Sequence, residues 1–338
     1  MSSSRISYFD ALNVFSCFSV IALHCNGIFH QYTQTAAWNF SAVIQVLFYC
    51  AVPVFFMLSG ATLLRYNERY STTDFYKKRL KKTLIPYLFF SVLFYALHCI
   101  IVHYVSLPTD GEESLTLLQI LVSGKAPFSN FWFFIPLFML YLFMPALSKI
   151  ALLPQKTMLF LCGAMIFFQG VYPVIAFFFD LKSITAPIGG YALYMFLGLL
   201  LHENDFEKDN KIYFSVVSLA LIAFATRLYL LFENADHRID LLMTYHGLYA
   251  ILPSMAIFMT FKRFLNTPYD TIKLLSGLSF GVYLIQQFVI QCCFSIAKKI
   301  TPNYEILMQT IGIIVVYLIC CLIVFIVRKI KILQWMFP

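Results

Sequence analysis

The chain has 338 residues, of which 61% are hydrophobic, 18% aromatic and only 12% charged. Soluble domains carry about 25% charged residues. The composition therefore excludes a soluble globular fold and predicts an all-α polytopic membrane protein, with 1–338 as a single domain and no soluble domain. The net charge of +8 does not indicate nucleic-acid binding, because Lys and Arg alternate between loops and do not gather on one recognition face.

Apolar runs of membrane length follow one another along the chain. A bilayer core needs about 20 mostly apolar residues per helix. This length predicts ten spans: 8–28, 42–64, 84–104, 130–148, 158–178, 187–201, 212–232, 242–261, 274–296 and 305–327. The span 187–201 is short and glycine-rich at its start, which predicts a tilted or interrupted helix. The first run is not a signal peptide, because it is too long, contains Asp10 and Asn13, and lacks a small-residue cleavage site.

The distribution of positive charge predicts the orientation. With the N-terminus inside, 18 of the 24 Lys and Arg residues lie in inner segments, and Arg227 lies within a span. The outer loops hold five, namely Lys125, Lys182, Arg238, Lys298 and Lys299. The positive-inside rule then gives a multi-pass protein of the cell membrane with both termini in the cytosol. The two longest outer segments are acidic and carry Asp110, Glu112, Glu113, Asp236 and Asp240.

Metal, disulfide and nucleotide-fold signatures are missing. The nine cysteines lie within or at the ends of apolar runs and lack the spacing with histidine of a metal site. We therefore expect structural thiols, with no metal and no redox cofactor. No P-loop or G-x-G-x-x-G motif is present, which excludes an ordinary nucleotide fold.

The first span carries three polar residues. Asp10 and Asn13 lie near its predicted inner end, and His24 lies about 24 Å along the helix, in the predicted outer half of the membrane. Ionisable groups at this depth usually mark a functional site. Imidazole suits general base catalysis near neutral pH. Structural alternatives stay open for both ionisable residues. His24 could bond to a neighbouring helix or snorkel to the outer interface, and Asp10 could be an interfacial helix cap or a helix-dipole group.

Three later stretches each allow a structural and a functional interpretation. Ser59 and Gly60 interrupt an apolar span, which favours close helix packing or room for a slim ligand chain. The segment "FYKKRLKKTLIPY", 75–87, is either a positive-inside anchor or a cradle for a phosphate-bearing donor. Trp132 belongs either to an aromatic belt or to a sugar platform.

These motifs together resemble the acyltransferase 3 family of integral membrane acyltransferases, which move acetyl or other short acyl groups from cytosolic acyl-CoA to hydroxyls of cell-surface glycans. The resemblance rests on five stretches in order: "FDALNVFSCFSVIALH", "VPVFFMLSGATLL", "FYKKRLKKTLIPY", "FWFFIPLFMLYLFMP" and "LSFGVYLIQQ". It covers nearly the whole chain.

The resemblance implies roles for individual residues. His24 corresponds to the family's essential histidine, and the donor-binding basic residues correspond to Arg79 and Lys82. The family's arginine eleven positions before that histidine is Asn13 here, and the histidine common in its "YLIH" stretch is Gln286. Asparagine supplies no charge, and glutamine cannot shuttle a proton.

The implied site is a cleft through the membrane. Its inner end, with Asp10 and Asn13, would lie near the acyl-CoA co-substrate, with Ser59 and Gly60 lining the cleft. Trp132 would lie on the side of the acceptor, a glycan or lipid-linked saccharide.

The implied reaction starts with His24 as the base. It takes the proton from the acceptor hydroxyl, whose oxygen attacks the thioester as CoA leaves. A transient acyl-histidine route stays open. The rival hypothesis is a glycan exporter, a flippase-like protein or a non-catalytic relative.

Overall fold

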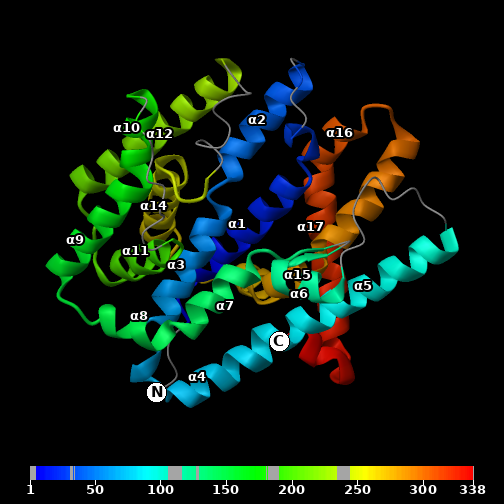
Figure 1. Ribbon diagram of the computed structural model, residues 1–338, viewed down its shortest axis with the longest axis horizontal. Helices are drawn as coiled ribbons and strands as arrows, with labels where there is room; N and C mark the ends of the chain where they lie inside the picture. Colours follow the sequence, from blue (N-terminus) through cyan, green and yellow to red (C-terminus); the bar gives the residue numbers. More distant parts are fainter. Residues whose placement is uncertain are drawn as a thin grey trace. The chain divides into compact units, whose positions relative to one another are not determined.

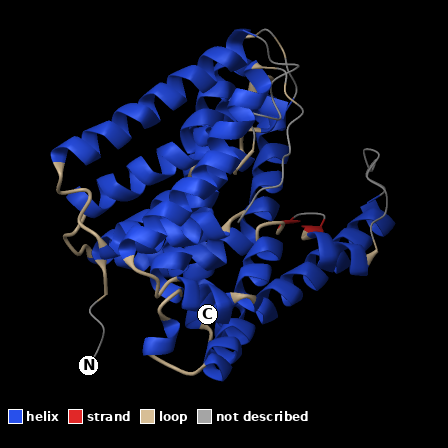
Figure 2. Ribbon diagram, turned by 60° about the vertical axis from the view of Figure 1, so that its left-hand side comes forward, coloured by secondary structure: helices blue, strands red, loops and turns tan. Residues whose placement is uncertain are grey.

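The computed structural model describes residues 5–30, 33, 35–105, 116–126, 129–179, 181, 190–233 and 244–337. Over these residues the regular secondary structure is helical apart from one antiparallel pair of two-residue strands, β1 (Lys125–Ala126) and β2 (Ser129–Asn130) (Figure 2). The predicted all-α class is therefore confirmed. Lys182, Arg238 and the five acidic residues expected in the outer loops lie outside the described residues.

The chain forms two compact units. The first comprises Met1–Arg69 and Met144–Ser276. Its α-helices, labelled in Figure 1, are α1 (Ser7–His24), α2 (Ala36–Phe48), α3 (Ala51–Leu63), α8 (Met144–Ile150), α9 (Gln155–Ile166), α10 (Tyr172–Phe178), α11 (Ala192–Glu203), α12 (Asn210–Glu233), α14 (Leu248–Phe264) and the start of α15 (Asp270–Ile300). Its shorter helical turns are η1 (Gly27–His30), η2 (Tyr66–Glu68) and η4 (Phe167–Val171).

The second unit comprises Tyr70–Phe143 and Gly277–Pro338. It holds α4 (Thr72–Arg79), η3 (Leu80–Leu84), α5 (Ile85–Val105), α6 (Leu117–Ser123), both strands, α7 (Phe134–Leu142), the rest of α15, α16 (Tyr304–Leu307), η5 (Met308–Gly312), α17 (Ile313–Lys329) and η6 (Lys331–Met336).

Six helical segments of the described chain are long and apolar enough to cross a membrane. They are Ala36–Glu68, Thr72–Ile100, Gln155–Ala176, Asn210–Glu233, Asp270–Ile300 and Tyr304–Lys329. Each of the ten predicted ranges overlaps at least one helix, but α1, α7, α8, α11 and α14 are not among these six. The multi-pass character is thus supported, while ten crossings and cytosolic termini stay predictions.

Two predicted spans are broken where a proline removes a backbone donor. The range 42–64 divides into α2 and α3 at Tyr49 and Cys50, because Pro53 has no N–H to donate to the carbonyl of Tyr49. The range 130–148 divides into α7 and α8 at Phe143, two residues before Pro145.

Prolines also follow two π-helical turns. In η3 the N–H of Ile85 bonds to the carbonyl of Leu80, and Pro86 follows at once. In η4 the N–H of Tyr172 bonds to the carbonyl of Phe167, and Pro173 follows at once. Both bonds span five residues instead of four, which is the π-helical pattern. The proline cannot donate to the carbonyl four residues before it, so the wider turn relieves that position.

The closest helix packing in the first unit joins α3 and α11. A Cβ atom on Gly60 would lie 2.0 Å from the carbonyl oxygen of Met195, and one on Gly198 would lie 2.0 Å from that of Met57. The two contacts are reciprocal, each made by the last residue of an M-x-x-G stretch, "MLSG" in α3 and "MFLG" in α11. Small residues permit such an approach of two backbones.

Contacts at both ends show that α3 and α11 run parallel. The ring of Phe56 stacks on that of Tyr191, the residue before α11, with centroids 4.4 Å apart. At the other end, Arg65 donates two hydrogen bonds to the carboxylate of Glu203, of 2.8 and 2.9 Å. Nε and Nη2 bind separate oxygens, which is the strong bidentate arrangement.

Candidate active site

His24 is the last residue of α1, and its side chain is half-buried. The helix ends without a glycine: Cys25 keeps a near-helical conformation, with φ −75° and ψ −6°, and its N–H still bonds to the carbonyl of Ile21. The chain then turns into η1. The histidine thus lies at the junction between a regular helix and a 3₁₀ turn.

Two residues beyond His24, a buried polar network ties this junction to α2. The amide nitrogen of Asn26 donates to the carbonyl oxygen of Ser41 over 2.9 Å and to Oε1 of Gln45 over 3.3 Å. The Ser41 hydroxyl donates back to Oδ1 of Asn26 over 2.7 Å. Asn26 and Ser41 are fully buried and Gln45 nearly so. This network was not predicted from the sequence, although Asn26 is a polar residue in an apolar run.

The other end of α1 carries a second polar cluster. Asp10 accepts two 2.7 Å hydrogen bonds from Arg5 and one of 2.7 Å from the hydroxyl of Ser276. Asn13 donates to the backbone oxygen and to the hydroxyl of Ser276, both at 3.0 Å. The bond to Asp10 raises the pKa of the Arg5 guanidinium.

An open cavity of about 130 Å³ adjoins this cluster, and its lining includes Arg5, Asp10, Tyr269 and Lys273. Asp10 and Asn13 were predicted to lie near the inner end of the first helix, and in the structure both bond to Ser276. Their side chains join α1 to the start of α15. Donor binding by either residue stays a prediction.

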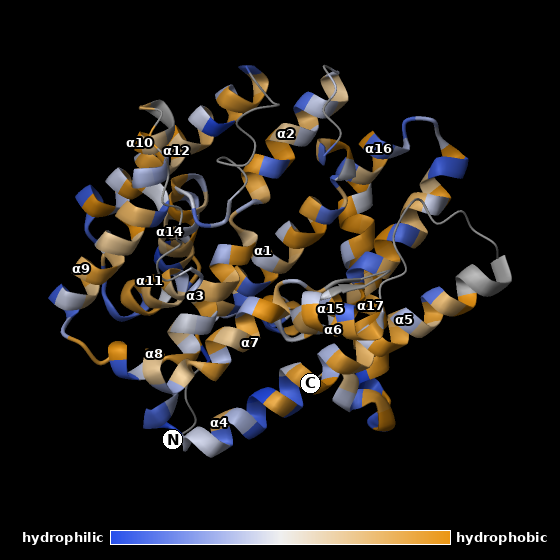
Figure 3. Cartoon of the chain, in the orientation of Figure 1, coloured by the Kyte–Doolittle hydropathy of each residue, from blue (hydrophilic) through white to orange (hydrophobic). Residues whose placement is uncertain are grey.

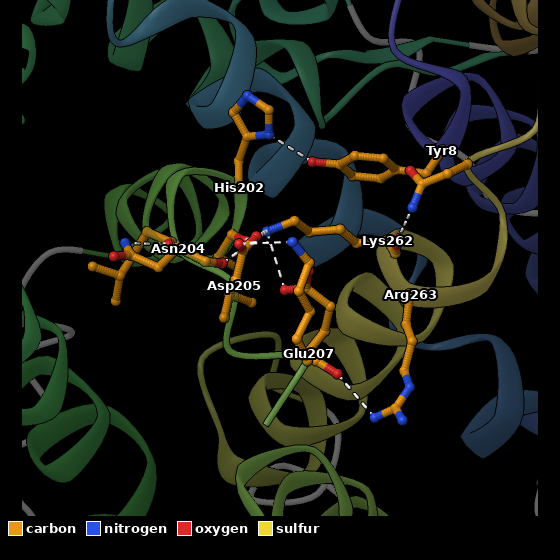
Figure 4. Close-up of polar contacts among 11 residues, drawn as sticks. Tyr8, His202, Asn204, Asp205, Glu207, Lys262 and Arg263 are labelled. Carbon is orange, nitrogen blue, oxygen red and sulfur yellow. Dashed lines mark hydrogen bonds and ion pairs between the residues drawn. The ribbon is translucent and has the colours of Figure 1, made fainter. Parts of the chain in front are cut away.

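A buried ion cluster follows the C-terminal end of α11 (Figure 4). Nζ of Lys262, on α14, donates to the carbonyl oxygens of Leu201 and Asn204 over 2.9 and 2.7 Å. It also lies 3.1 Å from the carboxylate of Glu207, whose side chain is 3% exposed, and 3.6 Å from that of Asp205. Lys262 therefore caps α11 and neutralises a buried carboxylate.

The same cluster reaches the first turn of α1. The hydroxyl of Tyr8 lies 2.6 Å from Nδ1 of His202, and Arg263 donates to the backbone oxygen of Glu207 over 2.9 Å. Hydrogen bonding to Lys208 lowers the pKa of the Asp205 carboxyl. From the sequence, Lys262 and Arg263 were predicted only to be inner positive charges. Their signal was the mixed run "HENDFEKDNK", 202–211, which supplies two carboxylates to Lys262 and the backbone oxygen of Glu207 and the amide oxygen of Asn210 to Arg263.

Arg227 is a fully buried cation within α12. Its guanidinium carbon lies 4.0 Å from the ring centroid of Tyr49, at the break between α2 and α3. The ring of Tyr49 in turn stacks on that of Tyr245, with centroids 4.3 Å apart and planes 3° from parallel. A cation on an aromatic face is an attractive arrangement that needs no carboxylate. Arg227 and Tyr245 thus both contact Tyr49, and the contacts join three separate segments.

In the second unit, the two predicted donor-binding residues of the basic segment 75–87 differ in exposure. Arg79 ends α4, is half-buried, and holds its guanidinium carbon 5.7 Å from the ring centroids of both Phe75 and Tyr141. Within the described residues its Nε is buried without a hydrogen-bond partner. Lys82 lies exposed in η3. Figure 3 shows hydrophilic residues concentrated along α4.

The remaining predicted residues are less informative. Gly60 takes part in the close approach of α3 and α11, so its packing interpretation is the one seen, while the cleft-lining role stays a prediction for it and Ser59. Trp132 lies half-buried between β2 and α7. Gln286, on α15, is 2% exposed. The described residues contain no group of three His, Cys, Asp or Glu side chains placed to hold a metal ion.

The predicted site residues divide between the two units. The first holds Asp10, Asn13, His24, Ser59 and Gly60, and the second holds Arg79, Lys82, Trp132 and Gln286. Within the first unit, the polar ends of α1 are about 21 Å apart from Asp10 to His24, at 1.5 Å per residue.

Comparison with known proteins gives one match. A family model described as an acyltransferase domain, the acyltransferase 3 model, matches residues 6–327. The match covers nearly the whole chain and both units. No curated protein and no solved structure matches the chain significantly.

Proposed function

Because this chain belongs to the acyltransferase 3 family of membrane acyltransferases, we propose that it transfers an acyl group, acetyl in the first instance, from cytosolic acyl-CoA to a hydroxyl of a cell-surface or lipid-linked glycan. The observation that carries this proposal is the placement of His24. It is a half-buried imidazole at the end of a helix whose other end gathers polar groups. The proposed reaction needs no metal or redox cofactor, and acyl-CoA acts as co-substrate.

In the proposed mechanism His24 is the general base. Its imidazole takes the proton of the acceptor hydroxyl as the oxygen attacks the thioester carbonyl. The new C–O bond forms, the C–S bond breaks, and the CoA thiolate leaves and takes up a proton. In the second proposed route the imidazole attacks first, and the acyl-histidine then passes its acyl group to the hydroxyl.

The basic segment supports binding of the donor phosphates. Lys82 is exposed, and the aromatic rings around Arg79 hold its guanidinium while leaving its Nε without a protein acceptor among the described residues. Arginine binds phosphate through paired N–H groups, and lysine adds point charge. The excess of positive charge on the predicted inner segments agrees with a donor that arrives from the cytosol.

The proposal is tested by replacing the histidine in purified protein reconstituted in lipid. The assay measures release of free CoA thiol from acetyl-CoA, with an envelope extract of the source cells as the acceptor mixture. His24→Ala should lose about 10² to 10⁴ in rate, which is the usual contribution of a general base. His24→Gln should lose nearly as much, because an amide can hydrogen-bond but cannot accept the proton.

A matched control is His30→Gln, which changes an exposed histidine in η1. It should retain the parent rate. Parent-level activity of His24→Gln would show that the imidazole only packs or hydrogen-bonds. Activity with succinyl-CoA but not with acetyl-CoA would keep the mechanism and correct the acyl group.

A further inference from the structure

We infer that Asn26, with Ser41, is a positioning residue that holds the imidazole of His24 in its working direction. This inference rests on the proposed role of His24 as the base. Asn26 lies two residues beyond that histidine and forms two hydrogen bonds with Ser41. Its side-chain amide donates to the backbone oxygen of Ser41, and the Ser41 hydroxyl donates to the side-chain oxygen of Asn26.

The end of a helix needs additional hydrogen bonds if one of its side chains has to be held in a defined position. The last four carbonyls of a helix lack partners within it, and helix ends fray at low cost. Here no left-handed glycine closes α1, because Cys25 stays near-helical. The N–H of Asn26 makes a turn-like bond of 3.2 Å to the carbonyl of Leu23. Fixing Asn26 therefore fixes the rotation of the last turn, and with it the Cα–Cβ direction of His24.

The polar character of Asn26 and Ser41 indicates that they fix the orientation of this turn and do not merely fill space. A leucine at position 26 would fill a similar volume and would itself bring no polar group that has to be bonded. A buried amide instead costs free energy unless it is bonded, so a fully buried amide and hydroxyl are stable only in one mutual geometry. The third bond, from Asn26 to Gln45 one turn further along α2, constrains the amide plane.

Packing around the pair reinforces the same junction. The ring of Phe29, in η1, stacks on Trp38 of α2 with centroids 5.9 Å apart, and the indole nitrogen donates to the carbonyl of Phe29 over 3.2 Å. Phe29 and Trp38 therefore hold η1 against α2, whereas Asn26 and Ser41 hold the turn that contains His24. Only the second pair is expected to affect the imidazole.

The expected effect is on turnover. A displacement of about 1 Å in a reacting group can cost about 10²-fold in rate. Asn26→Leu and Ser41→Ala should each lower kcat about 10- to 100-fold, with the KM for acetyl-CoA unchanged within about twofold. Because the two residues act through the same pair of hydrogen bonds, kcat of the double variant should be only slightly lower than that of either single variant. Ser41→Thr, which keeps the hydroxyl, should retain most of the parent kcat.

The experiment measures kcat per folded molecule, from thiol release with acetyl-CoA and the envelope extract, and counts folded protein by size-exclusion chromatography. Ser254→Ala is the matched control, because Ser254 on α14 is equally buried and donates one hydroxyl bond to the carbonyl of Ala250. It should leave kcat unchanged. If Asn26→Leu does not fold, Ser41→Ala and Gln45→Leu test the same network from α2.

The outcomes separate this inference from the proposed function. If His24→Gln keeps the parent rate, the base assignment fails first. If His24→Gln is inactive while folded Asn26→Leu and Ser41→Ala turn over at the parent rate, only the positioning role is wrong. A lower yield of folded protein with an unchanged kcat would likewise reduce the pair to a structural role.

Discussion

A methyl group added at the crossing of α3 and α11 should push the two helices apart. Gly60→Ala or Gly198→Ala would put Cβ 2.0 Å from a backbone oxygen, whereas real Cβ contacts essentially never fall below 3.0 Å. The helices must therefore separate by at least about 1 Å, since a backbone oxygen cannot rotate away as a side chain can.

The size of the loss follows from two opposing effects. Overpacking a close contact costs about 1–3 kcal/mol, and alanine in a helix interior returns about 0.5–1 kcal/mol relative to glycine. A net destabilisation of about 1–2 kcal/mol per substitution is expected, which raises the unfolded fraction about 5- to 30-fold. The bidentate pair of Arg65 and Glu203 lies at the ends of the same helices, so separation should weaken it too.

Thermal unfolding in detergent provides the measurement. Six cysteines are buried, so a thiol-reactive fluorophore reports their exposure on heating. Both alanine variants should melt at least about 2 °C below the parent. Gly163→Ala is the matched control, because its helical Cβ would have no neighbour within 4 Å, and it should be neutral or slightly stabilising. Equal melting temperatures for all three variants would show that α3 and α11 do not approach each other this closely.

Three further outcomes are expected. Replacing Arg79 and Lys82 by glutamine should raise the KM for acetyl-CoA about tenfold or more and leave that for the acceptor mixture unchanged, and added salt should act in the same direction; equal changes in both constants would make the segment a membrane anchor only. Lys262→Met should lower the stability by about 3 kcal/mol, because it leaves the 3% exposed carboxylate of Glu207 without its cation, and adding Glu207→Gln should restore part of the loss; a melting temperature equal to that of the parent would contradict the buried pair. Reporters fused after Lys82 and after Lys331 should both be cytosolic, and an external Lys331 reporter would reverse the predicted position of the C-terminus.

The sequence was sufficient for features that depend on local composition. The helical class follows from long apolar runs, since a bilayer permits few other folds, and the first helix was placed within a few residues of α1. The break at Tyr49 could also have been predicted, because Pro53 lies inside the apolar run that was interpreted as one span.

Features that depend on a distant partner were not accessible. The role of Asn26 depends on its hydrogen bonds with Ser41, which the sequence does not reveal. That of Asn13 depends on its hydrogen bond to Ser276, 263 residues away. The twin M-x-x-G stretches that end at Gly60 and Gly198 are too short to count as a repeat until their backbones are seen in contact. Lys262 shows why a count of charges is incomplete. It was predicted only as a positive residue of an inner segment, whereas in the structure it is buried and donates to carbonyl oxygens at the C-terminal end of α11.

The two proline-linked π turns, η3 and η4, also bear on how this chain tolerates change in length. A π turn accommodates one more residue than the α-helical turn it replaces, so it is equivalent to a one-residue insertion absorbed without breaking the helix. Each residue of an α-helix rotates the chain by about 100°, so one extra residue in a regular helix would turn every later residue onto another face. The wider turn takes up that rotation, and the basic residues of α4 and the apolar surface of α5 keep the faces they would have in an uninterrupted helix. Removing one residue from η3 should therefore let it close as a regular α-helical turn without moving α5 onto another face.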